Sequence, residues 1–150
     1  EKWLNMMRDK LGFFGEDQRD KKIIEDLLNW MEQNKADYTN TFCYLMNKDS
    51  IGNEIYKDQK FLTWIKNWKN RVLINNGSIE KSLKLMKNTN PTVIPRNHKV
   101  EEALLAANEN NLDNFNKLLS VLENPYDNLE NIDEFQFPSS NNNYQTYCGT

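Results

Sequence analysis

Apolar residues recur every three or four positions along most of this chain, which is the spacing that gathers side chains on one face of an α-helix. Several of the runs are bounded by residues that suit a helix end or a turn, such as Gly12, Gly77 and Pro125. Asp37 and Ser78 stand where each can cap the first turn of the helix that follows. The seven runs cover residues 3–11, 17–34, 37–46, 58–75, 78–86, 99–108 and 111–122.

The run at residues 58–75 is the most regular. Its aromatic side chains could stack against a ring-shaped ligand, but aromatic residues at helical spacing more often form a core. No alternating run marks a strand, so the predicted fold class is all-α, an irregular bundle of about seven helices with an extended C-terminal tail. The core cluster is expected at Phe61, Trp64, Ile65 and Trp68, and the last run is predicted to turn Leu112, Phe115, Leu118, Leu119 and Leu122 inward.

The pattern changes after residue 123. Residues 124–150 have no lasting period and include Pro138, two serines and three consecutive asparagines. We therefore predict a helical domain at residues 1–123 and an extended tail at residues 124–150 that ends in a cysteine. Because disordered segments tend to lack aromatic residues, the tail is expected to lie along a surface groove. Its aromatic residues are Tyr126, Phe135, Phe137, Tyr144 and Tyr147.

The charge of the chain limits the classes of partner. The formal net charge is −3, whereas nucleic-acid binding usually needs a concentrated basic surface, so no nucleic-acid partner is expected. No apolar run approaches the roughly 20 residues of a membrane span, and the first residues lack a signal-peptide pattern. These features predict a soluble protein with no membrane partner. The one local group of basic residues is interpreted as the solvated side of a helix; it consists of Lys57, Lys60, Lys66, Lys69 and Arg71.

No set of residues completes a standard catalytic or metal site. His98 is the only histidine, and without a fixed partner it is interpreted as a capping or surface residue. The glycines form no phosphate-binding loop, and no pair of carboxylates stands out as an acid–base dyad. The sequence therefore predicts no catalytic, cofactor-binding or metal-binding residue in this chain.

The two cysteines differ in their setting. Cys43 lies on an apolar helix face, where a buried and inert thiol is expected. Cys148 is the third residue from the end, where a thiol is either incidental or accessible to oxidation. Two such distant cysteines form neither a disulfide framework nor a metal site, which favours a reducing, cytoplasmic compartment. A thiol redox protein would need a bond between Cys43 and Cys148.

Four segments, in the same order along the chain, resemble the C-terminal region of the selenoprotein O (SelO) family. They are residues 36–42 (ADYTNTF), 90–104 (NPTVIPRNHKVEEAL), 124–127 (NPYD) and 144–150 (YQTYCGT). The last of them is similar to the C-termini of bacterial members. The resemblance implies that residues 1–123 are a fragment of a helical C-terminal domain.

The resemblance also implies an activity for the longer protein. Family members have a kinase-like, or pseudokinase, fold but act as protein adenylyltransferases, which use ATP with Mg²⁺ or Mn²⁺ to move AMP onto Ser, Thr or Tyr hydroxyls of protein substrates. Their nucleotide and metal sites precede the region that this chain resembles. This chain alone is therefore expected to be inactive and to have the kinase-like core of the same polypeptide as its partner.

One functional residue is implied by the resemblance. Cys148 is similar to the position that is selenocysteine in some family members and cysteine in others, and its implied role is redox regulation through a disulfide with the kinase-like core. The alternative is a stand-alone helical module that binds a partner protein through an apolar groove. The coding sequence upstream of Glu1 would distinguish the two hypotheses.

Overall fold

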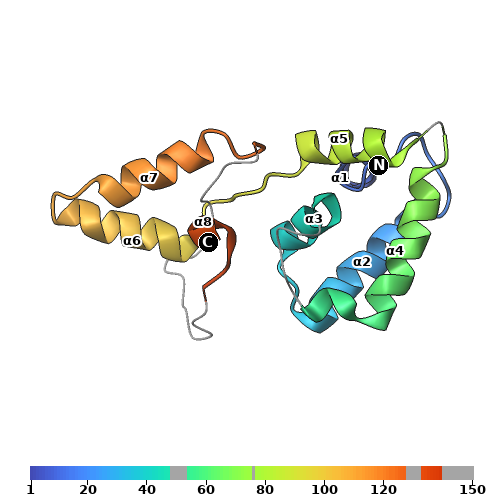
Figure 1. Cartoon of the computed structure of the whole chain (residues 1–150), viewed down its shortest axis with the longest axis horizontal. Coiled ribbons are helices and arrows are strands. Elements are labelled where there is room, and N and C mark those ends of the chain that lie inside the picture. The colour runs from blue at the N-terminus through green and yellow to red at the C-terminus, as the bar shows by residue number, and fades with distance from the viewer. Residues whose placement is uncertain (48–53, 76, 128–132, 140–150) are drawn as a thin grey trace. The chain divides into compact units, whose positions relative to one another are not determined.

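A computed structural model describes residues 1–47, 54–75, 77–127 and 133–139 of the chain (Figure 1). These residues form eight α-helices and one 3₁₀ helix and include no strand, which confirms the all-α fold class. About seven helices were predicted; the additional one is α8, a single turn in the range assigned to the tail. The elements are α1 (Lys2–Lys10), α2 (Asp20–Asn34), α3 (Tyr38–Met46), η1 (Glu54–Lys57), α4 (Gln59–Val72), α5 (Ile79–Thr89), α6 (Asn97–Asn108), α7 (Asp113–Leu122) and α8 (Asp133–Gln136).

The chain divides into two compact units. Unit one is Glu1–Asn90 and contains α1 to α5, and unit two is Pro91–Thr150 and contains α6 to α8. This division falls between Asn90 and Pro91. The separation of residues 1–123 from the tail at residues 124–150 stays a prediction. In the part of the chain that the structure describes, no helix combines the length and the apolar content needed to cross a membrane.

Local hydrogen bonds explain why several helices begin and end where they do. The carboxylate of Asp37 accepts a 2.8 Å hydrogen bond from the backbone N–H of Asn40, and the hydroxyl of Ser78 accepts one from Lys81 N–H at 3.2 Å. Both residues therefore cap their helices as the sequence predicted. Gly12 follows α1 with φ of +70°, and a Cβ atom placed there would lie 2.7 Å from the carbonyl oxygen of Ser82. Glycine alone satisfies both conditions.

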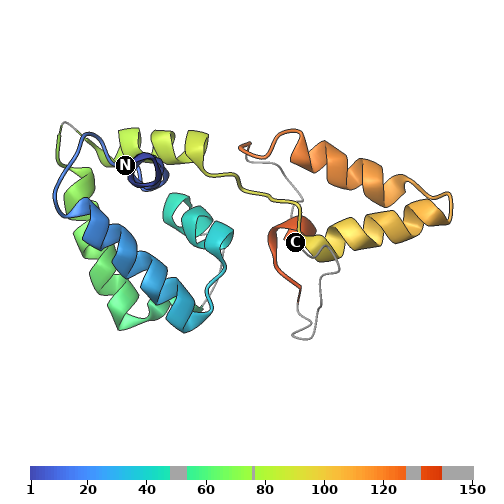
Figure 2. The same ribbon diagram turned by 180° about the vertical axis from the view of Figure 1, so that it is seen from behind.

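An aromatic cluster between α2 and α4 forms the centre of unit one. The two helices lie side by side in both views (Figures 1 and 2). The rings of Trp30 and Phe61 stack with centroids 4.3 Å apart, and those of Trp64 and Trp68 stack at 6.4 Å. The indole N–H groups of Trp64 and Trp68 donate to the backbone carbonyls of Ile23 and Leu11 at 2.7 and 2.9 Å, so no indole donor is left buried without an acceptor in this pair. The predicted core cluster on α4 is confirmed, since Phe61, Trp64, Ile65 and Trp68 are all buried.

Unit two is built on a hairpin of α6 and α7, which lie side by side in both views (Figures 1 and 2). Its core is small and comprises Val93, Ala103, Leu118 and Phe135, with Val100, Val121 and Leu122 packed against it. The prediction that the whole apolar stripe of α7 turns inward is therefore wrong. Only Leu118 is buried, whereas Leu112, Phe115 and Leu119 are 53%, 43% and 45% exposed. The reason is geometric: the apolar arc of α7 is wider than the side that α6 and α8 can cover.

Candidate functional site

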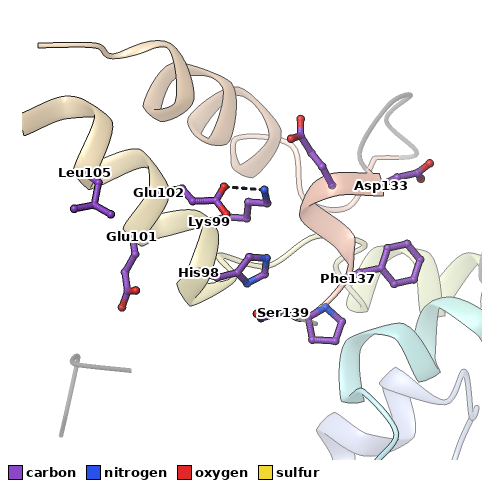
Figure 3. Close-up of a pocket in the computed structure, with 10 residues that line it drawn as sticks. His98, Lys99, Glu101, Glu102, Leu105, Asp133, Phe137 and Ser139 are labelled. Atoms are coloured by element: carbon purple, nitrogen blue, oxygen red, sulfur yellow. Dashed lines mark hydrogen bonds and ion pairs between the residues drawn. The ribbon is translucent and has the colours of Figure 1, made fainter. Parts of the chain in front are cut away.

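Unit two contains a hollow next to His98. It lies between α6 and α8 and has a volume of about 550 Å³ (Figure 3). Lys99 forms a 2.8 Å ion pair with Glu102, and Figure 3 shows the Glu101 side chain pointing away from that pair. Other lining residues are Leu105, Asp133, Glu134, Phe137, Pro138 and Ser139.

The side chains of this hollow do not converge on a reaction centre. His98 is the second residue of α6 and is half-buried. It therefore lies at a helix start but not at the N-cap position, which Arg96 occupies. Four carboxylates border the hollow, yet among the residues that the structure describes no three His, Cys, Asp or Glu side chains are grouped to hold a metal ion.

The most strongly organised charges lie in unit one, where Asp20 is fully buried between two arginines. Its carboxylate accepts hydrogen bonds from Arg71 Nε at 2.5 Å and from Arg8 Nε at 2.8 Å. Arg71 also donates to the backbone carbonyls of Phe14 and Gly15 at 3.2 and 3.0 Å. Burial acts to raise the pKa of Asp20, but the hydrogen bonds from Arg71 and Arg8 outweigh it and hold the pKa below its ordinary value. This cluster joins α1, α2 and α4 and is structural, since its groups satisfy one another.

The place of Arg71 corrects the predicted basic helix side. The four lysines of that group are exposed, as expected, but Arg71 is only 1% exposed and points into the protein. A sequence signal for this existed: Arg71 continues the spacing of Trp64 and Trp68, which places it on the buried face of α4. An arginine on an apolar stripe needs a buried anion, and Asp20 supplies it.

Asn90 is a second residue whose role the pattern did not reveal. Its amide group is buried, donates to the carbonyls of Lys10 and Met86 at 2.8 and 3.0 Å, and accepts a 3.1 Å hydrogen bond from Lys10 Nζ. Burial lowers the pKa of Lys10, and its ammonium group lies 5.0 Å from the centroid of the Phe42 ring. These contacts fasten the end of α5 to the end of α1.

Two of the segments that carry the family resemblance contact each other in unit two. The backbone N–H of Thr92 donates to the carbonyl of Pro125 at 2.7 Å, and the Thr92 hydroxyl donates to the same oxygen at 3.1 Å. Arg96 Nη2 donates to the carbonyl of Gln136 at 2.7 Å and so anchors α8. The residues of these segments therefore hold the unit together.

The structure tests the prediction for only one of the two cysteines. Cys43 is buried, 3% exposed, as predicted for an inert thiol on an apolar face. Cys148, the one residue to which a redox role was assigned, lies outside the described residues.

Comparison with known proteins assigns the family. The family model described as protein adenylyltransferase SelO matches residues 1–123, and the chain belongs to this family. The predicted resemblance is therefore confirmed.

Several curated relatives match almost the whole chain. A protein nucleotidyltransferase YdiU from Pelagibacter ubique is 51% identical over 99% of this chain, and those from Nitrosococcus oceani and Clostridium botulinum are 44% and 45% identical over 100% and 99% of it. The chain covers 31% of the length of each of these relatives.

Proposed function

We propose that this chain is the helical C-terminal region of a SelO-like protein adenylyltransferase. In the longer polypeptide, AMP would pass from ATP to Ser, Thr or Tyr hydroxyls of protein substrates. The observation that carries the proposal is the 51% identity over 99% of this chain to a relative named as a nucleotidyltransferase, of which the chain covers 31%.

The residues of this chain would stabilise the kinase-like core and would not take part in AMP transfer. ATP and Mg²⁺ or Mn²⁺ would bind in the kinase-like core, as the resemblance to the family implies. The helices would pack against that core, which is the proposed partner, and stabilise its active conformation. The compartment proposed for the protein is the cytoplasm.

Redox control through Cys148 is the second part of the proposal. Oxidation would form a disulfide bond between Cys148 and a cysteine of the kinase-like core. The two thiols would lose two protons and two electrons to an oxidant of thiols. The support is the resemblance of residues 144–150 to the C-termini of bacterial family members, which implies this role for Cys148 as the third residue from the end. The other cysteine, Cys43, is buried.

An AMP-transfer assay tests the proposal. The longer polypeptide and residues 1–150 alone are each incubated with labelled ATP, Mg²⁺ or Mn²⁺ and acceptor proteins. We expect transfer by the longer polypeptide and none by residues 1–150. Transfer by residues 1–150 alone would refute the supporting role, and absence of transfer by the longer polypeptide would refute the activity.

The alternative, a stand-alone interaction module, is favoured by one observation, the exposed apolar side chains of α7. It requires a gene whose reading frame begins near Glu1. A long coding region upstream of Glu1 for a kinase-like domain would exclude it.

A further inference from the structure

One face of the α6–α7 hairpin carries large apolar side chains that the described residues of unit two leave open. We call it the hairpin face and define it by Leu104 on α6 and by Leu112, Phe115 and Leu119 along α7. Each of these side chains is between 43% and 54% exposed. Scattered single apolar residues are normal on a protein surface, but a group of them marks an interaction site.

Helix geometry shows that Leu112, at the N-cap of α7, shares one side with Phe115 and Leu119. Phe115 follows Leu112 by three positions and Leu119 follows Phe115 by four, which is the spacing of one helical stripe. Lys117 is two positions from both Phe115 and Leu119, so it points about 200° away from them. Because Lys117 pairs with Glu134 and lies over the ring of Phe135, α8 covers the opposite side of α7.

The same argument places Leu104 on that side of the hairpin. Lys99, Glu101, Glu102 and Leu105 line the hollow that α6 shares with α8, and Leu104 does not. Leu104 is two positions beyond Glu102, about 200° around the helix from it. The hairpin face is therefore the side of both helices that α8 does not reach.

The border of the hairpin face is acidic. Glu123 follows Leu119 by four positions on the same stripe, and Asp113 adjoins Leu112. The two lysines of the hairpin are engaged elsewhere, Lys99 with Glu102 and Lys117 with Glu134. No ion pair neutralises Asp113 or Glu123 within the ranges that the structure describes. A partner for this face therefore needs an apolar surface with a basic border.

We propose that the hairpin face is the surface through which this region docks on the upstream part of its own polypeptide, at an apolar patch bordered by Lys or Arg. This inference rests on the proposed function and adds the contact surface to it. The relatives are about three times as long as this chain, since the chain covers 31% of them. A face on a region attached to so much further protein meets that protein at high effective concentration.

Site-specific photo-cross-linking in the longer polypeptide tests this docking. Phe115→p-benzoylphenylalanine introduces a photoreactive ring of similar shape, and Leu119→p-benzoylphenylalanine is a second probe in case the first variant folds poorly. The matched probe is Lys117→p-benzoylphenylalanine on the opposite side of α7, which is expected to capture residues 133–136 and so to report a folded hairpin. Captured peptides are identified by mass spectrometry.

The expected result is capture of residues upstream of Glu1 as the major product from positions 115 and 119. Capture of a second copy of the protein, of residues 1–90, of residues 140–150 or of nothing overturns the proposal. Glu123→Lys reverses the charge at one position of the border without altering the apolar side chains, and it is expected to lower the yield of the upstream product severalfold. An unchanged yield would contradict the basic border.

The AMP-transfer assay on the unsubstituted protein separates this inference from the proposed function. Upstream capture without AMP transfer would leave the docking surface standing and remove the activity. AMP transfer without upstream capture would do the reverse.

Discussion

Asp20 and Arg71 are 51 positions apart in the sequence, yet the carboxylate and the guanidinium meet at 2.5 Å with both side chains excluded from solvent. Arg8 adds a second contact to the same carboxylate. Removing one partner of a buried ion pair leaves the other charge without compensation, which costs more than the pair itself contributes.

Asp20→Asn is therefore expected to lower the free energy of unfolding by about 3–5 kcal/mol, because two buried arginines lose their anion. Urea unfolding followed by circular dichroism measures the change. Asp26→Asn is the comparison, since Asp26 pairs with Lys22 on the surface of α2, and it should leave the transition almost where it was. Equal effects of the two substitutions would contradict the central place of Asp20.

The pH dependence of stability follows from the same carboxylate. The pKa of Asp20 is held below the ordinary value of 3.8 in the folded protein, so the unfolded chain binds the proton more readily. The stabilisation is fully present above about pH 4 and is lost as the pH falls through the folded pKa. Denaturant midpoints measured from pH 7 down to pH 2 should fall less steeply for Asp20→Asn than for the unsubstituted protein. Parallel curves would show that Asp20 does not carry this dependence.

Gly12→Ala is expected to destabilise the protein by more than about 1 kcal/mol, since a side chain at positive φ is strained and its Cβ would meet a backbone oxygen at 2.7 Å. Gly15→Ala is the matched change. Gly15 also has positive φ, but the neighbour there is the flexible side chain of Asn75, so its cost should be smaller. Thermal melts of the two variants give the order, and a larger loss at Gly15 would contradict the close approach at Gly12.

Lys10 and Asn90 are expected to be energetically coupled. The combined loss from Lys10→Met and Asn90→Ala should be smaller than the sum of the single losses by about 0.5–1.5 kcal/mol, because either change alone already breaks their shared hydrogen bond. A double-mutant cycle based on urea midpoints measures this coupling. Additive losses would mean that the contact contributes nothing to stability.

In the longer polypeptide, Cys148→Ser should leave AMP transfer under reducing conditions nearly unchanged and remove its dependence on oxidation. Cys43→Ser is the comparison, because Cys43 is buried and should not affect that dependence. The measurement is AMP transfer at a series of thiol–disulfide ratios. Redox sensitivity that persists in Cys148→Ser would assign the switch to another thiol.

Helical periodicity predicted most of the fold because it reports which side of each segment avoids water. Asp37, Ser78 and Gly12 were found for the same reason, since each satisfies a local backbone requirement that residue type alone reveals. The failures concern partners distant in sequence. Periodicity shows that Arg71 shares a face with Trp64, but it does not identify the anion that permits its burial.

The hairpin of α6 and α7 illustrates the second limit. A stripe of leucines and a phenylalanine has the same sequence pattern whether it packs on a core or binds a partner. The pattern therefore predicted that Phe115 and Leu119 are buried, whereas both are exposed. The prediction of the candidate site had a different limit. Cys148 was found through its resemblance to a family position and not through any local pattern.

All four tryptophans, Trp3, Trp30, Trp64 and Trp68, belong to unit one, and unit two has none. Tryptophan fluorescence therefore reports on the first ninety residues alone. Far-ultraviolet circular dichroism reports on the helices of both units, including α6 and α7. The chain thus contains a natural pair of spectroscopic probes. Superimposable melting curves from the two signals would identify one cooperative transition, and separated curves would give the stability of each unit in a single experiment without any added label.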